Sequence, residues 1–128
     1  MDKNDIKNLA QQYLFERLSP EPKDPFADDE SAFDKVYDIT HGDPEKAWQI
    51  ILELFQQAKD DKSLAYVAAG PLEDTISNFP DIIIDRVINL AKKDARFRKC
   101  LKGVWGRNSM PAEIRKQIDD VVANEPDW

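Results

Sequence analysis

The chain has 128 residues, with 18 lysines and arginines against 25 aspartates and glutamates, which gives a net charge of −7. This length fits one domain, and a single core at this size buries about two-thirds of the unfolded surface. The lone cysteine, Cys100, excludes an intrachain disulfide, and the sequence has neither a secretory leader nor an apolar run of transmembrane length. We therefore expect a soluble protein of the reducing cytoplasm.

The charge is distributed unevenly along the chain. Residues 1–64 hold 15 acidic and 8 basic side chains, whereas residues 65–128 hold 10 of each. A basic block in the second half consists of Arg86, Lys92, Lys93, Arg96, Arg98, Lys99, Lys102 and Arg107. An acidic protein favours basic partners and repels nucleic acid, although an exposed basic patch still contacts phosphate. The other interpretation is that the basic helices pack against the acidic ones.

The first half of the chain predicts three helices. Apolar residues recur at helical spacing over residues 3–18. Residues 19–31 contain three prolines and a run of acids, which is typical of an extended surface loop. Ser31 is placed to cap a short second helix that Gly42 closes, and Asp43-Pro44-Glu45 is a start signal for a long third helix through the core.

The chain is organised around the segment from Leu64 to Ile76. Its first part, residues 64–69, is apolar on every side, which predicts a buried helix. Gly70 is expected to close this helix in the left-handed conformation, and Pro71 suits the first position of a new one. Glu73 and Asp74 then fall in a first helical turn, where free N–H groups favour negative charge.

The remaining residues predict further helices and short turns. Apolar residues over 82–91 follow helical spacing and favour a helix over a strand, and Asp94 is placed to cap the next helix. Residues 105–108 read as a turn, Met110-Pro111 opens a last helix, and residues 124–128 form a frayed tail unless Trp128 docks.

Together these elements predict an all-α fold. Residues 1–128 form a single compact domain of about seven or eight short helices arranged as antiparallel pairs. HEAT-like stacking and compact orthogonal packing both remain open, because no residues match at a fixed period.

No group of residues makes a catalytic, cofactor or metal-binding signature. The four glycines are scattered, which excludes a phosphate-binding loop, and His41 with Cys100 is too little for a zinc site. Cys100 shares a helical face with apolar residues and is expected to be buried. We therefore expect no cofactor and no metal, and an enzyme is the less favoured class.

Two short segments form the candidate interaction site. Glu73 and Asp74 either complement a helix dipole or bind a partner. Trp105, Arg107 and Asn108 combine an aromatic ring, a turn and a guanidinium group, which is common in recognition surfaces. The alternative is that Trp105 continues the inner face of its helix while Arg107 caps backbone carbonyls.

Three stretches carry a family resemblance: residues 48–54, residues 64–74 with the GPLED segment, and residues 97–111 with the WGRN turn. They resemble a family of small bacterial proteins known as a domain of unknown function, in which the GPLED and WGR segments recur in this order and spacing. The resemblance covers about residues 44–115. It implies a bacterial, cytoplasmic, helical domain and a joint role for Glu73, Asp74, Trp105 and Arg107, but it brings no activity.

Three hypotheses follow for the function. The leading one is a non-enzymatic, acidic helical module that binds another protein, with a basic partner favoured, as immunity proteins and inhibitors do. The second is a small-ligand or enzymatic site where Glu73, Asp74 and Arg107 converge beside Trp105, which requires the GPLED and WGRN segments to be adjacent. The third is nucleic-acid binding through residues 86–107, which the net charge opposes. No membrane association is expected, and the sequence leaves monomer and homodimer open.

Overall fold

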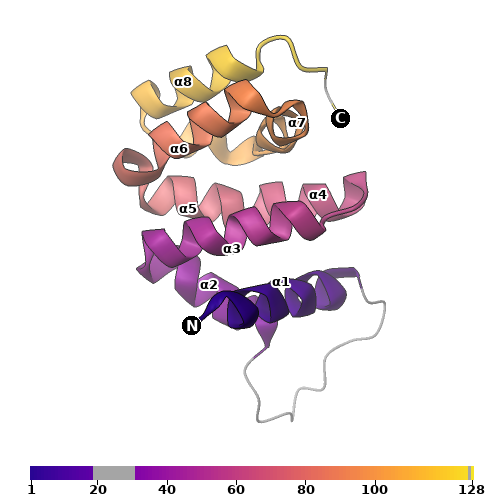
Figure 1. Ribbon diagram of the computed structural model, residues 1–128. Coiled ribbons are helices and arrows are strands. Elements are labelled where there is room, and N and C mark those ends of the chain that lie inside the picture. The colour runs from indigo at the N-terminus through magenta and orange to yellow at the C-terminus, as the bar shows by residue number, and fades with distance from the viewer. Residues whose placement is uncertain (19–30, 127) are drawn as a thin grey trace.

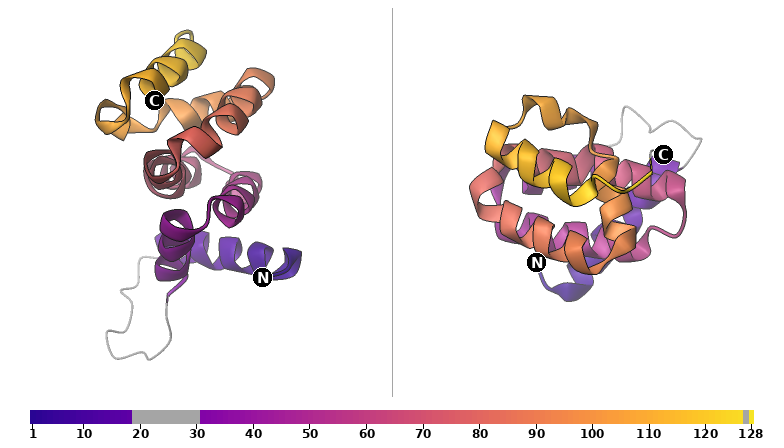
Figure 2. Two further views of the ribbon diagram at one scale, coloured as in Figure 1. Left: turned by 90° about the vertical axis from the view of Figure 1, so that its left-hand side faces the viewer. Right: turned by 90° about the horizontal axis from the view of Figure 1, so that it is seen from above.

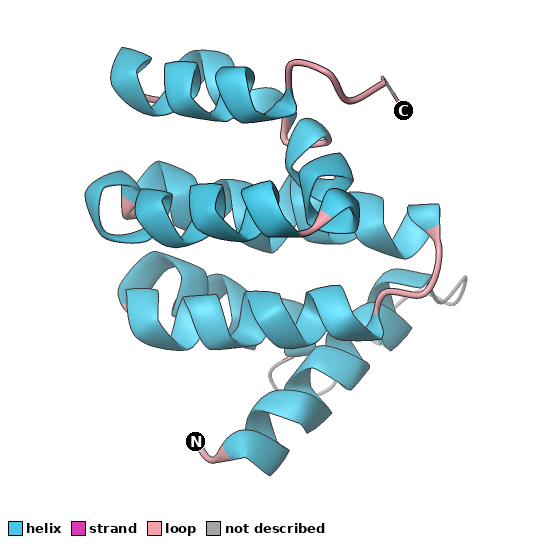
Figure 3. Cartoon of the chain, turned by 45° about the horizontal axis from the view of Figure 1, so that its top comes forward, coloured by secondary structure: helices cyan, strands magenta, loops and turns pink. Residues whose placement is uncertain are grey.

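The computed structural model of the chain describes residues 1–18, 31–126 and 128 (Figure 1). This part is all helical and contains no strand, as predicted (Figure 3). None of its helices has the length and apolarity needed to cross a bilayer. The predicted Pro-rich loop, residues 19–31, lies outside the described residues except for Ser31. The elements are α1 (Lys3–Leu18), α2 (Ala32–Gly42), α3 (Pro44–Gln57), α4 (Asp61–Val67), the π turn η1 (Ala68–Leu72), α5 (Glu73–Asn78), α6 (Pro80–Lys93), α7 (Ala95–Lys102), the 3₁₀ turn η2 (Trp105–Ser109) and α8 (Ala112–Val122).

The helices form layers that follow one another in chain order. The stack runs from α1 and α2 at one end, through α3 and the α4–α5 layer, to α6, α7 and α8 at the other (Figures 1 and 2). The short connection after α3 turns the chain back, so that α4 and α5 run antiparallel to α3 (Figure 1).

Three of the predicted helix starts are confirmed by their caps. The side chains of Ser31, Asp43 and Asp94 each accept a hydrogen bond from a backbone N–H two or three residues further on, at 2.9 to 3.1 Å. Such a cap contributes about 0.5 to 2 kcal/mol to stability, because it satisfies a donor that the helix leaves unpaired. These boundaries are therefore determined by single local side chains.

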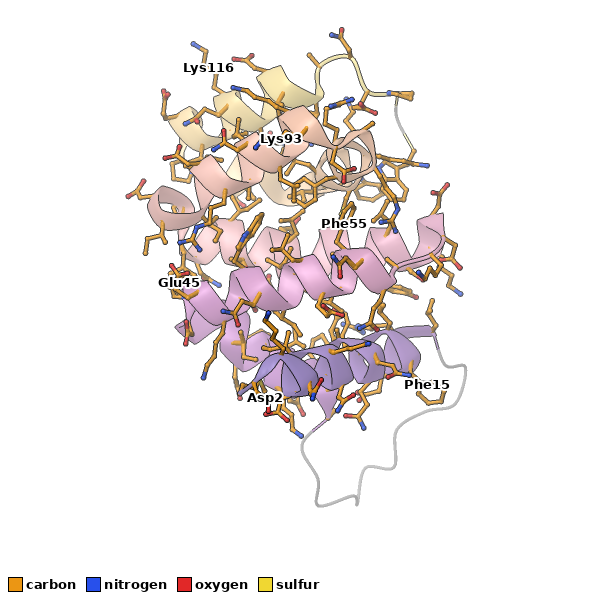
Figure 4. All side chains as sticks on the ribbon, in the orientation of Figure 1. Asp2, Phe15, Glu45, Phe55, Lys93 and Lys116 are labelled. Atoms are coloured by element: carbon orange, nitrogen blue, oxygen red, sulfur yellow. The ribbon has the colours of Figure 1, made fainter. Side chains whose placement is uncertain are left out.

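The core is built around α3, which has neighbouring layers on both sides. The inner face of this helix is fully buried at Ala47, Ile50, Ile51 and Leu54. Phe55 points from α3 toward α7, where its ring meets Phe97 edge-on at 5.3 Å between centres (Figure 4). The predicted long helix through the core is confirmed.

The predicted helix break at Gly70-Pro71 is wrong. α4, η1 and α5 form one continuous helix over residues 61–78, and no glycine in the described part of the chain has a positive φ. Pro71 has no N–H, and in a regular α-helix its ring would collide with the carbonyl four residues earlier. The chain widens into a π turn instead, in which the N–H of Glu73 bonds to the carbonyl of Ala68, five residues back.

Two expectations based on that break are wrong as well. No helix begins at Pro71 and the N–H of Glu73 is bonded within the helix, so the helix dipole does not explain Glu73 and Asp74. The segment is not buried on every side either, since Ala65 and Ala69 are exposed. The central helix therefore has a solvent-facing side, and its two carboxylates need another explanation.

The C-terminal tail is docked through Trp128. Its indole N–H donates to the carbonyl of Lys99 at 2.9 Å, and the Lys99 ammonium lies 5.2 Å from the centre of the ring. Glu125 pairs with Arg98 at 2.8 Å just before it. Of the two alternatives for the tail, docking of Trp128 is the one that the structure has.

Candidate functional site

The central helix of residues 61–78 carries two adjacent stripes that face different neighbours. The stripe facing η2 and the C-terminal tail consists of Ala65, Ala69 and Glu73. The stripe facing α1 and α2 consists of Tyr66, Gly70 and Asp74. Consecutive residues in a helix point about 100° apart, so the carboxylates of Glu73 and Asp74 point to different sides of one helix.

The GPLED and WGRN segments are joined by a hydrogen bond. The backbone N–H of Gly106 donates to Oε1 of Glu73 at 2.7 Å. A Cβ at position 106 would lie 2.7 Å from both Cδ and Oε1 of Glu73, so the carboxylate occupies the space that a side chain would need. A side chain at position 106 would therefore displace the Glu73 carboxylate, and the adjacency of the two segments that the second hypothesis needed is present.

An apolar groove lies on this side of the central helix. Its volume is about 360 Å³, and it is lined by Ala65, Ala69, Gly103, Trp105 and Trp128. Trp105 is 82% exposed and Trp128 is 41% exposed. The expectation that Trp105 continues the inner face of its helix is wrong, because α7 ends at Lys102 and the extended backbone of Val104 redirects the chain.

A small hollow of about 20 Å³ lies on the other side of the central helix. It is lined by Tyr13, Phe33, Val36, Tyr37, Thr40, Gly70, Pro71 and Asp74. Burial raises the pKa of Asp74, an effect that His41 opposes and Glu73 reinforces. Among the described residues no group donates a hydrogen bond to this carboxylate.

The hollow is bordered by a line of rings on α2. Phe33, Tyr37 and His41 follow each other at four-residue spacing, and the rings of Tyr37 and His41 are stacked with centres 3.8 Å apart. The guanidinium of Arg17 lies 4.2 Å from the centre of the Phe33 ring and 5.7 Å from the centre of the Tyr13 ring. These rings therefore already hold one cation that comes from within the chain.

Arg107 takes part in a different contact. Its Nε pairs with Asp119 of α8 at 3.1 Å, and its Nη1 donates to the carbonyls of Leu101 and Lys102 at 3.5 and 3.3 Å. This is the capping role that the sequence offered as an alternative. Asn108 is exposed on η2. The structure thus brings Glu73 to the WGRN turn. Arg107 instead links the C-terminal end of α7 to Asp119 of α8.

The basic block packs against acidic residues from other elements. In the described part of the chain its ion pairs include Arg86 with Glu45, Arg98 with Glu125, Lys99 with Asp61, and Arg107 with Asp119. The paired guanidinium lowers the pKa of Glu45. This arrangement agrees with the interpretation that the basic helices face acidic ones.

Cys100 is buried, as predicted, and burial raises the pKa of its thiol to about 12. The Sγ atom lies 3.7 Å from the carbonyl oxygen of Leu64. A thiol with such a pKa is not a nucleophile near neutral pH. Within residues 1–18, 31–126 and 128, no three His, Cys, Asp or Glu side chains gather closely enough to hold a metal ion.

Sequence reasoning did not identify the residues that enclose Asp74. The spacing of Phe33, Tyr37 and His41 on one helical stripe is a signal that was present in the sequence. Tyr13 reaches the hollow from α1, and nothing local indicates that contact. Trp128 was considered only as a docking residue of the tail, and its place in the groove depends on the carbonyl of Lys99.

These features define a small, all-helical domain whose central helix has the apolar groove on one side and the hollow that contains Asp74 on the other. The sequence model of a family of unknown function, DUF6869, matches residues 22–125, and the chain belongs to this family. No curated protein and no solved structure matches the chain. The family name carries no activity, so the function has to be argued from the geometry.

Proposed function

We propose that this chain is a non-enzymatic interaction module that binds another protein through the central helix, the apolar groove on one side of it and the hollow on the other. The observation that carries the proposal is the exposure of Trp105, which is 82% exposed at the edge of an apolar groove. Covering a tryptophan removes about 150 to 250 Å² from water, which contributes about 4 to 6 kcal/mol at most. Exposed tryptophans of this kind are enriched among residues that dominate protein interfaces.

The arrangement of the polar groups supports binding rather than catalysis. Acid–base chemistry requires two titratable groups aimed at one substrate. The carboxylate of Glu73 accepts the N–H of Gly106, and the guanidinium of Arg107 is engaged by Asp119 and two carbonyls. Both groups therefore serve the fold.

A basic partner is favoured by the charge of the chain. The net charge is −7, and the excess of acids lies in residues 1–64. Such a field accelerates association with basic proteins and disfavours nucleic acid. Nucleic acid would contact the basic block, of whose eight residues Arg86, Arg98, Lys99 and Arg107 form ion pairs within the chain. We expect an immunity- or inhibitor-like role in a bacterial cytoplasm, the setting that the resemblance and the single reduced thiol imply.

The test compares three tagged proteins as baits in lysate from the source organism: the wild type, Trp105→Ala, and Phe15→Ala. Phe15 is a matched control because its ring, on α1, is also largely exposed, at 72% (Figure 4). The captured protein is then purified, and its affinity for each bait is measured by calorimetry. We expect Trp105→Ala to weaken binding by roughly 30-fold or more, as for a hot-spot residue, and Phe15→Ala to change it less than about threefold. Equal affinities for all three baits would refute the proposal.

A second candidate is supported by the groove itself. Its volume of about 360 Å³ lies within the range of small-ligand sites, about 300 to 1,000 Å³. A saturable change in tryptophan fluorescence with an apolar probe, absent in Trp105→Ala and accompanied by no captured protein, would favour this alternative.

A further inference from the structure

The hollow beside Asp74 has the properties of a cation site. Its carboxylate is half-buried between α2 and the central helix, and no donor in the described part of the chain bonds to it. Removing a carboxylate from water is costly unless a partner compensates. The raised pKa of Asp74 has this cause, and the opposing effect of His41 offsets it only in part.

The size of the hollow restricts which cation fits. Its volume is about 20 Å³, and about 10 to 15 Å³ accommodates one water molecule. The ammonium group of lysine is a compact head of about that size with three donors, whereas the guanidinium of arginine is a planar fork with three nitrogens. The hollow therefore fits an ammonium group better than a guanidinium group.

The walls of the hollow also suit an ammonium group. The rings of Phe33 and Tyr37 border it and are partly exposed, so a cation entering from solvent would pass along them. Glu73 adds negative potential next to Asp74, and His41 is the group on α2 that would compete when protonated. The Arg17 guanidinium already lies over the Phe33 ring, so Tyr37 is the ring on α2 that borders the hollow without a cation from the chain against it in the described residues.

We propose that the hollow beside Asp74 receives the ammonium group of a lysine side chain presented by the partner protein, with Asp74 as the counter-ion. The inference rests on the proposed function, because it names the chemistry by which that partner is recognised. Trp105 would form the apolar contact with the partner on one side of the central helix. Asp74 would select for a positively charged side chain of the partner on the other side.

The experiment titrates the ¹⁵N-labelled full chain with capped lysine amide and follows the backbone amide signals by NMR. It is run at low salt and at about pH 8, where histidine side chains are ordinarily neutral. The matched probes are the Nε-acetylated lysine amide, which lacks the charge, and the capped arginine amide, which has the larger head. The matched variants are Asp74→Asn and Glu113→Gln, the second on α8 at an exposed carboxylate.

We expect saturable shifts at Gly70, Asp74 and Tyr37 with lysine amide, at a dissociation constant of roughly 10 mM, as for an ion pair strengthened by a cation–π contact. Asp74→Asn should weaken this binding at least tenfold, Glu113→Gln should leave it unchanged, and the arginine and acetylated probes should bind several-fold more weakly. The inference is overturned by equal shifts with the acetylated probe, by arginine binding as tightly as lysine, by binding that survives Asp74→Asn, or by the absence of saturable shifts up to about 100 mM.

Failure of this inference can be told apart from failure of the proposed function. If Trp105→Ala releases the captured protein while lysine amide shifts no signal in the hollow, the interaction role holds and the lysine site is wrong. If lysine amide binds at Asp74 while all three baits bind a captured protein equally, the hollow is a cation site and the interface lies elsewhere.

Discussion

Replacing Gly106 with alanine tests the contact between the central helix and η2. The new Cβ would lie 2.7 Å from Cδ and Oε1 of Glu73, which is closer than real Cβ contacts, so the flexible carboxylate has to move away. The backbone at this position has φ −76° and ψ 16°, which alanine also adopts, so the cost is the lost hydrogen bond and not backbone strain. A hydrogen bond to a charged group contributes about 1.5 to 3 kcal/mol; because Glu73 is partly hydrated, we expect a loss of about 1.5 to 2 kcal/mol.

A double-mutant cycle isolates this contact from other effects of the substitution. Glu73→Ala removes the same hydrogen bond, so adding Gly106→Ala in that background should cost nothing more and could gain about 0.4 to 1 kcal/mol from the stiffer unfolded chain. The free energies of unfolding of the four proteins are measured by urea denaturation followed by circular dichroism. If the two single losses simply add in the double variant, Glu73 and Gly106 do not interact and the reasoning is refuted.

Four further predictions concern single positions. Asp74→Asn should raise the melting temperature near neutral pH, because burial penalises the ionised form of Asp74 and raises its folded-state pKa. The gain in melting temperature over the wild type should shrink as the pH falls through that pKa, and a gain that persists in acid would contradict this reasoning. Gly70→Ala should lose about 1 to 3 kcal/mol in urea denaturation, because its Cβ would stand 2.9 Å from the hydroxyl of Tyr13; Tyr13→Phe should recover part of this loss, and equal losses in both backgrounds would rule out the clash. Cys100, with a thiol pKa of about 12, should react with a thiol reagent at about pH 8 only as fast as the chain opens; labelling at the rate of a free cysteine would contradict its burial. Trp105→Ala should change the free energy of unfolding by less than about 0.5 kcal/mol, since so little of the ring is covered; a loss above 2 kcal/mol would assign it to the fold.

Helix starts were predictable from the sequence because their signals are local. The caps Ser31, Asp43 and Asp94 need only their own side chains and backbone N–H groups two or three residues on. At Gly70-Pro71 the local signal indicated a break, yet η1 packs against α2, α3 and α7, and this packing outweighs the local preference. Whether such a junction breaks or widens depends on contacts distant in sequence, which is why it could not be predicted.

The candidate site was predicted as segments but not as contacts. The second hypothesis required the GPLED and WGRN segments to be adjacent, as they are, but Glu73 and Gly106 are 33 residues apart. Nothing local shows that the Glu73 carboxylate occupies the space beside Gly106. The direction of Trp105 depends on where α7 ends, and the enclosure of Asp74 depends on Tyr13 from α1. Positions of this kind are determined by tertiary packing rather than by propensity.

The π turn over Ala68–Leu72 determines the direction in which the side chains after it point, as well as the path of the backbone. It accommodates one residue more than a regular turn, and each residue turns an α-helix by about 100°. Deleting one residue here to restore a regular helix would keep Ala65 in its groove while swinging Asp74 away from its hollow. The direction of Asp74 relative to Ala65 is thus determined by the number of residues in this one turn, so a single-residue deletion would leave Ala65 beside Trp105 and take Asp74 out of the lining of its hollow.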